Sequence, residues 1–101
     1  ILAAFPDLDV LAVATPDHLH TEPILAALRR GVHVLTEKPM CLTLAEADAI
    51  IDEAAARGLV VAVDMHKRYD PDHLRIRDDI QNRIGAPLYG TAYLEEPLEV
   101  S

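Results

Sequence analysis

The amino-acid sequence predicts an α/β fold: a partial doubly wound parallel sheet with flanking helices. Three short apolar runs, 9–14, 32–36 and 60–64, are separated by two segments of helical periodicity, 19–30 and 44–57. Runs that are apolar throughout are typical of parallel strands buried on both faces. Strands that alternate with helices of this length are joined by right-handed crossovers. We therefore expect the three runs to be neighbouring parallel strands.

The ends of the helices carry recognisable signals. Each of the two helical segments ends in arginine followed by glycine, an order that favours a helix C-terminus. Thr43 and Glu46 have the spacing of a capping box before the second helix. Asp70 followed by Pro71 predicts the start of a third helix, which we expect to run to about residue 83.

A change of pattern follows the third helix. Residues 84–87, Ile-Gly-Ala-Pro, would break it, and the alternating residues 88–94 predict a strand that is less buried than the first three. We expect residues 1–85 to form the C-terminal half of one domain and residues 86–101 to begin a second α/β domain.

Composition excludes several classes of partner. The 101 residues carry a formal net charge of −8, which would repel nucleic acid and anionic membrane surfaces. The single cysteine, Cys41, cannot close an internal disulfide, and the cysteine and histidine spacing does not fit a structural zinc site. No apolar run approaches the ~18 residues of a membrane span. We expect a cytoplasmic protein without a metal, and, because the sequence opens at Ile1 and stops after a strand-like stretch, a piece of a longer chain.

Polar and titratable residues are concentrated directly after the three predicted strands, in segments 15–20, 37–39 and 64–71. The carboxyl ends of parallel strands share one edge of a sheet, and ligands of open α/β sheets bind outside that edge. The opposite ends of the strands carry glycines and few reactive side chains. The sequence therefore predicts a functional site at the carboxyl edge.

The same three segments resemble a known family. Thr-Pro-Asp-x-x-His at 15–20, Ala-Leu-Arg-Arg-Gly-Val-His-Val-Leu-Thr-Glu-Lys-Pro at 27–39 and His-Lys-Arg-Tyr-Asp-Pro at 66–71 are similar to motifs of the Gfo/Idh/MocA family, which includes glucose–fructose oxidoreductase and inositol dehydrogenase. The most specific element is Glu-Lys-Pro directly after a strand. Asp17 stands where the family usually has asparagine, a conservative change.

The resemblance implies a Rossmann domain that binds NAD or NADP. It also implies that the full-length enzyme transfers hydride between the cofactor and a carbinol or carbonyl carbon of a small-molecule sugar, inositol or related polyol. The glycine-rich phosphate loop would precede Ile1, and the general base would follow Ser101. This segment alone would be inactive, and a second domain would hold the subunits of a homo-oligomer together.

The resemblance also implies roles for individual residues. Thr15 and Pro16 would line the cofactor crevice, and His20 would lie beside the dinucleotide. Lys38 would approach both the nicotinamide ribose and the substrate hydroxyl as the catalytic cation, because a cation near a developing alkoxide helps a carbinol lose its proton. Glu37 would bind near the cofactor and position that lysine.

Further expectations concern the connecting loops. His66 and Arg68 would lie on a substrate-side loop that leads into the second domain. The sharp turn after the second strand, together with the resemblance, predicts a cis peptide bond between Lys38 and Pro39.

Simpler roles for these residues remain open. Lys38 could merely be a solvated residue at a strand end, His20 a helix-surface histidine, and Arg68 an ion-pair partner of Asp70 or Asp72. The function also has two alternatives: another enzyme on a doubly wound fold, such as a flavodoxin-like module, or a non-catalytic dinucleotide-binding regulator. A glycine fingerprint upstream, or an Asp-x-x-x-His pair downstream, would distinguish among them.

Overall fold

The computed structural model describes residues 2–93 and contains a three-stranded sheet. Its strands are β1 (Val10–Val13), β2 (His33–Glu37) and β3 (Val61–Asp64). Their order in the sheet is β1-β2-β3, and both pairs are parallel. The predicted parallel arrangement of the three apolar runs is confirmed.

The chain divides into two compact units. The first ends at His66, and the second begins at Lys67. The first unit contains the sheet and its helices. The second contains a short 3-10 turn, one helix and the segment that follows it. The predicted domain boundary between residues 85 and 86 stays a prediction.

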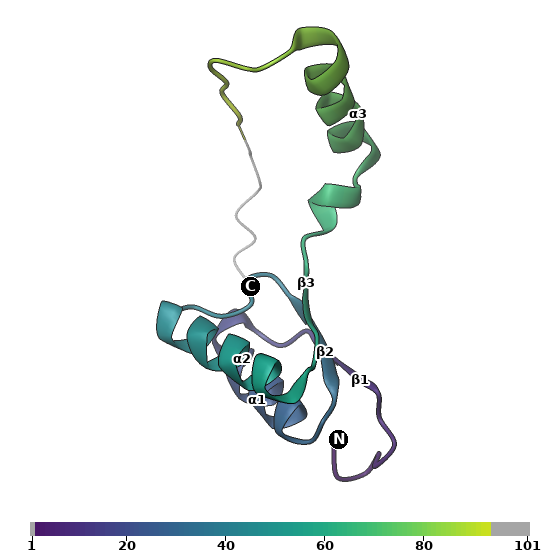
Figure 1. Cartoon of the computed structure of the whole chain (residues 1–101), viewed down its shortest axis with the longest axis vertical. Helices are drawn as coiled ribbons and strands as arrows, with labels where there is room; N and C mark the ends of the chain where they lie inside the picture. The colour runs from purple at the N-terminus through teal and green to yellow at the C-terminus, as the bar shows by residue number, and fades with distance from the viewer. Residues whose placement is uncertain (1, 94–101) are drawn as a thin grey trace, which may run out of the picture. The chain divides into compact units, whose positions relative to one another are not determined.

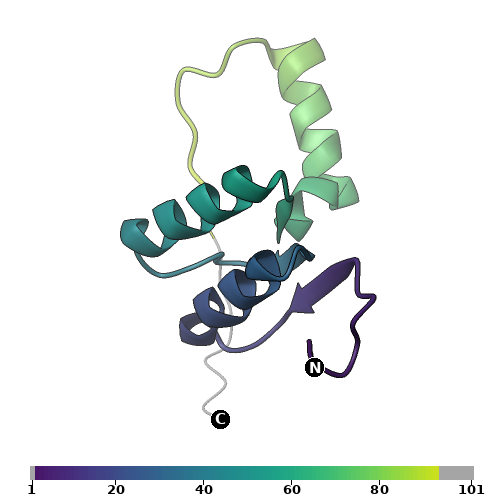
Figure 2. The same cartoon turned by 60° about the horizontal axis from the view of Figure 1, so that its bottom comes forward.

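Two helices cover one face of the sheet (Figure 1, Figure 2). Helix α1 (Thr21–Arg29) connects β1 to β2, and helix α2 (Leu44–Arg57) connects β2 to β3. The strand order β1-β2-β3 means that both connections step to the next strand in the same direction across the sheet. Since parallel connections are right-handed, both helices then lie on the same face. Helix α1 begins two residues later than predicted, because Asp17–Leu19 form a separate 3-10 turn, η1.

Helix α2 has the predicted bounds and the predicted cap. The Thr43 hydroxyl accepts a hydrogen bond from the Glu46 backbone N–H at 3.2 Å, and the Glu46 carboxylate accepts one from the Thr43 N–H at 2.9 Å. The helix ends at Gly58, whose φ of 64° is left-handed and therefore favours glycine. Both ends of α2 are thus set by local sequence.

The capping box makes a pH-dependent contribution to stability. The Thr43 side-chain hydrogen bond is the largest influence on Glu46 and lowers the pKa of its carboxyl below the ordinary value. Because the folded pKa is depressed, this contribution is present above the unfolded pKa of about 4.3 and is lost as the pH falls through the folded pKa.

Replacing Thr43 by alanine is therefore expected to destabilise the protein at neutral pH. Loss of an N-cap hydroxyl costs about 1 kcal/mol. The difference in the free energy of unfolding from the native sequence should shrink at acidic pH. There Glu46 is protonated and accepts more weakly from the Thr43 N–H. Urea unfolding of both proteins at neutral and acidic pH measures this, and a difference that does not change with pH would contradict the assignment.

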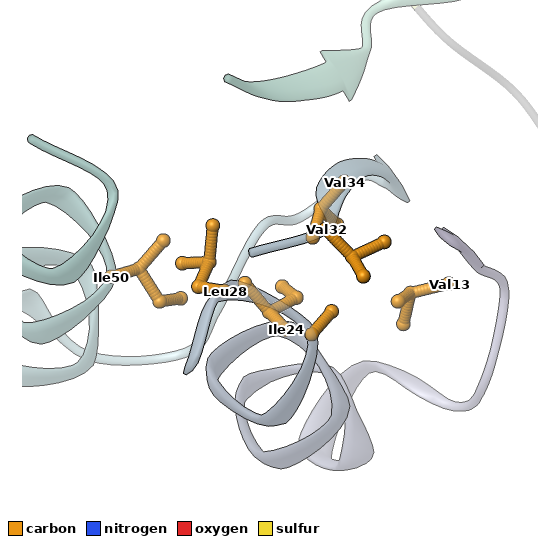
Figure 3. Close-up of a cluster of buried hydrophobic side chains, with 7 residues drawn as sticks. Val13, Ile24, Leu28, Val32, Val34 and Ile50 are labelled. Carbon is orange, nitrogen blue, oxygen red and sulfur yellow. The ribbon is translucent and has the colours of Figure 1, made fainter. Parts of the chain in front are cut away.

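The core lies between the sheet and the two helices (Figure 3). Ile24 and Leu28 of α1 and Ile50 of α2 are almost completely buried against the inward side chains of the strands. Among residues 2–93, the buried apolar residues are Val13, Ile24, Ala27, Leu28, Val32, Val34 and Ile50. Within residues 2–93 no helix is long and apolar enough to cross a bilayer.

The second face of the sheet is open in this chain, so the expectation of burial on both faces is wrong here. Val10 is 51% exposed and Leu35 46% exposed, and Ala12 and Ala62 are also exposed. Successive residues of a strand point to opposite faces, and the two helices can cover only one of them. The exposed face is nevertheless apolar, which is typical of a sheet face that another element covers.

The second unit is helical where it is most regular. Helix α3 (Pro71–Asp79) is capped by Asp70, whose carboxylate accepts hydrogen bonds from two backbone N–H groups at its start. Residues Ile80–Ile84 continue as a π-helical segment, closed by a hydrogen bond from the Gly85 N–H to the Ile80 carbonyl at 2.9 Å. The third predicted helix is therefore present, with a change of helix type near its end.

The predicted strand 88–94 is not formed over residues 88–93, and Leu94 lies outside the described residues. Leu88 is fully exposed, and both Tyr89 and Tyr93 are mostly exposed. Alternation alone does not make a strand, because its backbone groups must pair with a neighbouring strand. The described residues supply no partner strand for this stretch.

Candidate functional site

The loops that follow the strands meet at the carboxyl edge of the sheet. In the register, Val13 lies opposite Thr36, and Glu37 lies opposite Asp64. The loop that begins with Thr15 and Pro16 therefore leaves the sheet beside the loop that begins with Lys38. The structure thus brings four of the predicted site residues, Thr15, Pro16, Glu37 and Lys38, to one edge.

The loop after β1 is held by its own hydrogen bonds. The Leu19 N–H donates to the Pro16 carbonyl at 2.8 Å, and the Thr15 hydroxyl donates to the Leu19 carbonyl at 3.1 Å. These bonds wind residues 17–19 into the turn η1 before α1 begins. Thr15 and Pro16 are exposed at the edge, so a ligand can reach them.

His20 is completely buried at 0% exposure, so the alternative of a helix-surface histidine is wrong. Its Nδ1 lies 2.7 Å from the Pro39 carbonyl oxygen, and its Nε2 lies 2.7 Å from the Thr15 carbonyl oxygen. Both ring nitrogens are thus occupied by protein atoms. The ring joins the loop after β1 to the loop after β2, and it leaves no nitrogen available to a dinucleotide in this arrangement.

Lys38 directly follows β2, the central strand of the sheet, and its side chain is exposed. The bond between Lys38 and Pro39 is cis, which confirms the prediction. Across residues 2–93 the Lys38 ammonium forms no ion pair, and in particular none with Glu37. The structure therefore presents a cation at the edge that no described carboxylate neutralises.

One residue of the predicted segment 64–71 lies at the edge without having been predicted as a cofactor- or substrate-binding residue. Asp64 ends β3 and is half-buried opposite Glu37, so a second carboxylate lies at the same edge. Its position in the sequence, as the last residue of an apolar run, was the available signal. Among the residues that the structure describes, no cluster of histidine, cysteine, aspartate and glutamate has the arrangement of a metal site.

The predicted substrate-side loop contains the 3-10 turn η2 (His66–Tyr69). His66 is the last residue of the first unit, and Arg68 belongs to the second. Both side chains are exposed. Their common membership of one site is a proposal and not an observation.

The pairing alternative for Arg68 can be compared with the observed ion pairs. Asp70 pairs with Lys67 at 3.6 Å and with His73 at 3.4 Å, and the His73 hydrogen bond is the largest of the influences that lower the pKa of the Asp70 carboxyl. Asp72 pairs with Arg75. In the described part of the chain, Arg68 therefore has neither aspartate as its partner. It lines a groove of about 420 Å³ whose other lining residues are Lys67, His73, Leu74 and Arg77.

A second hollow, of about 600 Å³, runs along β1 and α1 and includes Thr15 at one end. Its walls are mainly aliphatic, with Leu2, Leu11, Val13 and Ala26 among the lining residues. Thr15, Glu22 and Arg30 supply the polar side chains of this hollow.

The glycines with positive φ in the first unit do not lie at the carboxyl edge. Gly31 and Gly58, which have positive φ, precede β2 and β3 and therefore lie at the opposite end of the sheet. A pyrophosphate site requires a glycine-rich turn that leads from a strand into a helix N-terminus. The described residues 2–93 contain no such turn.

Comparisons with known proteins agree with the fold and with the motifs. Residues 2–65 match the Gfo/Idh/MocA family model, described as an oxidoreductase family with an NAD-binding Rossmann fold. The 1,5-anhydro-D-fructose reductase of Ensifer adhaerens is 41% identical over 88 residues, which is 86% of this chain and 26% of that protein. The chain thus spans about a quarter of the length of the curated relatives that it matches.

Solved structures give the same result. A 3-ketoreductase from Actinomadura kijaniata, crystallised with NADP and TDP-benzene, has a TM-score of 0.70 at 34% identity over 76% of this chain and 25% of that one. An inositol dehydrogenase homologue from Azotobacter vinelandii, crystallised with NADH and myo-inositol, has a TM-score of 0.55 at 43% identity over 55% of this chain and 15% of that one. With its parallel sheet and its motif residues at the carboxyl edge, the chain belongs to the Gfo/Idh/MocA family of oxidoreductases with an NAD-binding Rossmann fold.

Proposed function

We propose that this chain is a segment of a longer oxidoreductase that transfers hydride between NAD or NADP and a carbinol or carbonyl carbon of a sugar, inositol or related polyol. The observation that carries the proposal is the exposed, unpaired Lys38 at the end of the central strand, on the edge where α/β sheets bind ligands. Support for the substrate class comes from the names of the relatives, which include a D-glucoside 3-dehydrogenase and an inositol 2-dehydrogenase.

In this proposal Lys38 acts on the substrate oxygen. When bound, the nicotinamide supplies or accepts the hydride. A carbinol that loses hydride must also lose its hydroxyl proton, so negative charge develops on the oxygen. An ammonium held at that oxygen stabilises the charge without rearranging during the reaction. No described carboxylate competes for the Lys38 ammonium, so it would be available for this contact.

The other edge residues would bind the cofactor. Thr15 and Pro16 are exposed beside Lys38 and would line the crevice, while Glu37 would contribute a carboxylate to its rim. His66 and Arg68, both exposed, would belong to the substrate-side loop that the family resemblance implies. Association into a homo-oligomer is proposed for the full-length protein, through residues that follow this segment.

The proposal is tested by activity of the full-length protein that carries this segment. Purified protein is incubated with NAD⁺ or NADP⁺ and a panel of aldoses, glucosides, inositols and linear polyols, and reduced nicotinamide is followed by its absorbance. We expect turnover with at least one class of polyhydroxylated substrate. Tight dinucleotide binding without turnover on any of them, in either reaction direction, would instead support a regulator.

A separate prediction concerns the 101-residue chain itself. It is expected to bind NADH and NADPH with a Kd weaker than about 1 mM. The physical reason is that most dinucleotide affinity comes from a glycine-rich turn and helix N-terminus around the pyrophosphate, whereas Gly31 and Gly58 lie at the other end of this sheet. Calorimetric titration measures this directly. A micromolar Kd for either dinucleotide would place the main affinity determinants within this chain and contradict the prediction.

A further inference from the structure

The buried imidazole of His20 is bracketed by two backbone carbonyl oxygens. One belongs to Thr15 in the loop after β1, and the other to Pro39 in the loop after β2, each 2.7 Å from a ring nitrogen. The two carbonyls are 24 residues apart in sequence (39 − 15). Through this ring the two loops at the carboxyl edge are linked, and Pro39 directly follows Lys38.

The two partners of the ring are both hydrogen-bond acceptors. A carbonyl oxygen can only accept a hydrogen bond, whereas a neutral imidazole has one N–H donor and one lone pair. A neutral His20 would satisfy one carbonyl and hold a lone pair against the other at 2.7 Å. A doubly protonated ring donates to both, and 2.7 Å is a typical length for charge-assisted hydrogen bonds.

His33 provides the contrast within the same sheet. The Val60 backbone N–H donates to its Nδ1 at 3.0 Å, so that nitrogen of His33 carries no proton. His33 starts β2, whereas His20 is bonded to the loop beyond the end of β2. The two histidines therefore link neighbouring segments at opposite ends of the sheet. The Nδ1 of His33 faces a donor, whereas the Nδ1 of His20 faces an acceptor.

Burying a charged ring is unfavourable unless hydrogen bonds replace the lost water. Both ring nitrogens of His20 lie 2.7 Å from a carbonyl oxygen, and within the described ranges no carboxylate pairs with the ring. The ring is also necessary to its partners, since removing it would leave two carbonyls without this donor in the interior of the loop cluster.

We propose that His20 is the positioning residue of the site: as a doubly donating imidazolium it ties the Thr15 carbonyl to the Pro39 carbonyl, and so fixes the backbone that carries Lys38. The expected fall in kcat when His20 is replaced rests on the proposed function of Lys38. The presence of two N–H groups on the His20 ring does not depend on that function. The proposal therefore has one test that is independent of catalysis and one that is not.

The first test is the number of protons on each ring. The full-length enzyme is labelled with ¹⁵N at its histidines, and imidazole N–H correlations are recorded at neutral pH. His20 is expected to show two slowly exchanging N–H correlations, assigned in the native enzyme through scalar couplings from the ring to the His20 backbone, and His33 at most one. A single N–H correlation from His20, with the second nitrogen unprotonated, would overturn the proposal.

The second test is kinetic. His20→Phe keeps a ring of similar size without donors, and we expect kcat to fall about tenfold, because small displacements of a catalytic group are costly. The cofactor KM should change less than kcat, since His20 has no nitrogen directed at a ligand. His20→Gln can donate to one carbonyl, so its kcat should lie between that of the native enzyme and that of His20→Phe. The matched control His33→Phe should leave kcat within about twofold of the native value.

The outcomes separate this proposal from the proposed function. An unchanged kcat in a folded His20→Phe enzyme overturns the positioning role. Should that variant fail to fold, as judged by circular dichroism, the protonation measurement on the native enzyme decides. Full activity of Lys38→Ala together with two His20 N–H correlations would refute the catalytic role of Lys38. The proposed link between the Thr15 and Pro39 carbonyls through His20 would still stand.

Discussion

Replacing Lys38 by alanine in the full-length enzyme is expected to lower kcat about a hundredfold, with a much smaller change in the cofactor KM. Loss of one preorganised group that stabilises developing oxyanion charge costs about 3 kcal/mol of transition-state stabilisation, which corresponds to that factor. The lysine lies at the end of the central strand, exposed and without a described ion-pair partner, so under the proposed function its charge is available to the substrate oxygen.

The control is Lys38→Arg, which keeps the charge and changes its shape. A planar guanidinium cannot occupy the place of a compact ammonium, so this variant should recover little activity. Had the lysine only held the dinucleotide, the loss would appear in the cofactor KM while kcat stayed near normal. Circular dichroism checks the fold of both variants. A Lys38→Ala enzyme that keeps more than about half of its kcat at saturating cofactor and substrate would refute the catalytic role.

The parts of the fold that were predictable are those encoded by neighbouring residues. The bounds of α2 follow from the Thr43 cap and from Gly58, both of which act within one helical turn. The parallel pairing of the three strands follows from the order of elements, because crossover helices leave few alternatives. The start of α1 was less accurate, because Leu19 was counted as the first apolar residue of the helical pattern, whereas it ends the 3-10 turn at residues 17–19.

The predictions that were wrong concern a strand at residues 88–93 and burial of both faces of the sheet. Both depend on packing partners that lie far away in the sequence or outside the described residues. Residues 88–93 alternate like a strand, but a strand requires a partner. The apolar run of β1 indicates two covered faces, yet the helices of this chain cover one, and Val10 remains exposed on the other. Alternation and hydropathy report what a segment can pack against, and not whether the packing partner is present.

The candidate site shows the same division. Its location at the carboxyl edge was predictable from topology, and the structure places Thr15 and Lys38 there. The environment of His20 was not predictable, because its two partners are backbone carbonyls that any sequence would supply. Only the three-dimensional path of two loops reveals that this histidine contacts protein and not solvent.

The largest loss of stability is expected at the contact between α2 and the rest of the core. Ile50 is 1% exposed and packs into the buried cluster against α1, as Figure 3 shows. Truncating a buried isoleucine to alanine removes its transfer free energy and leaves a cavity, at a cost of about 3 kcal/mol. A loss of that size is a large fraction of the stability of a small domain, so Ile50→Ala should populate the unfolded chain measurably.

Its neighbour provides the matched control. Ile51 has the same side chain in the same helix but is 56% exposed, so Ile51→Ala should cost less than about 1 kcal/mol. Helix propensity changes equally in the two variants, and the difference between them therefore isolates burial. Urea unfolding of the 101-residue chain, followed by circular dichroism, gives both free energies. Equal losses for the two variants would mean that α2 does not pack on the core through the face that contains Ile50, and the position of the loop that carries Lys38 would then lack its support.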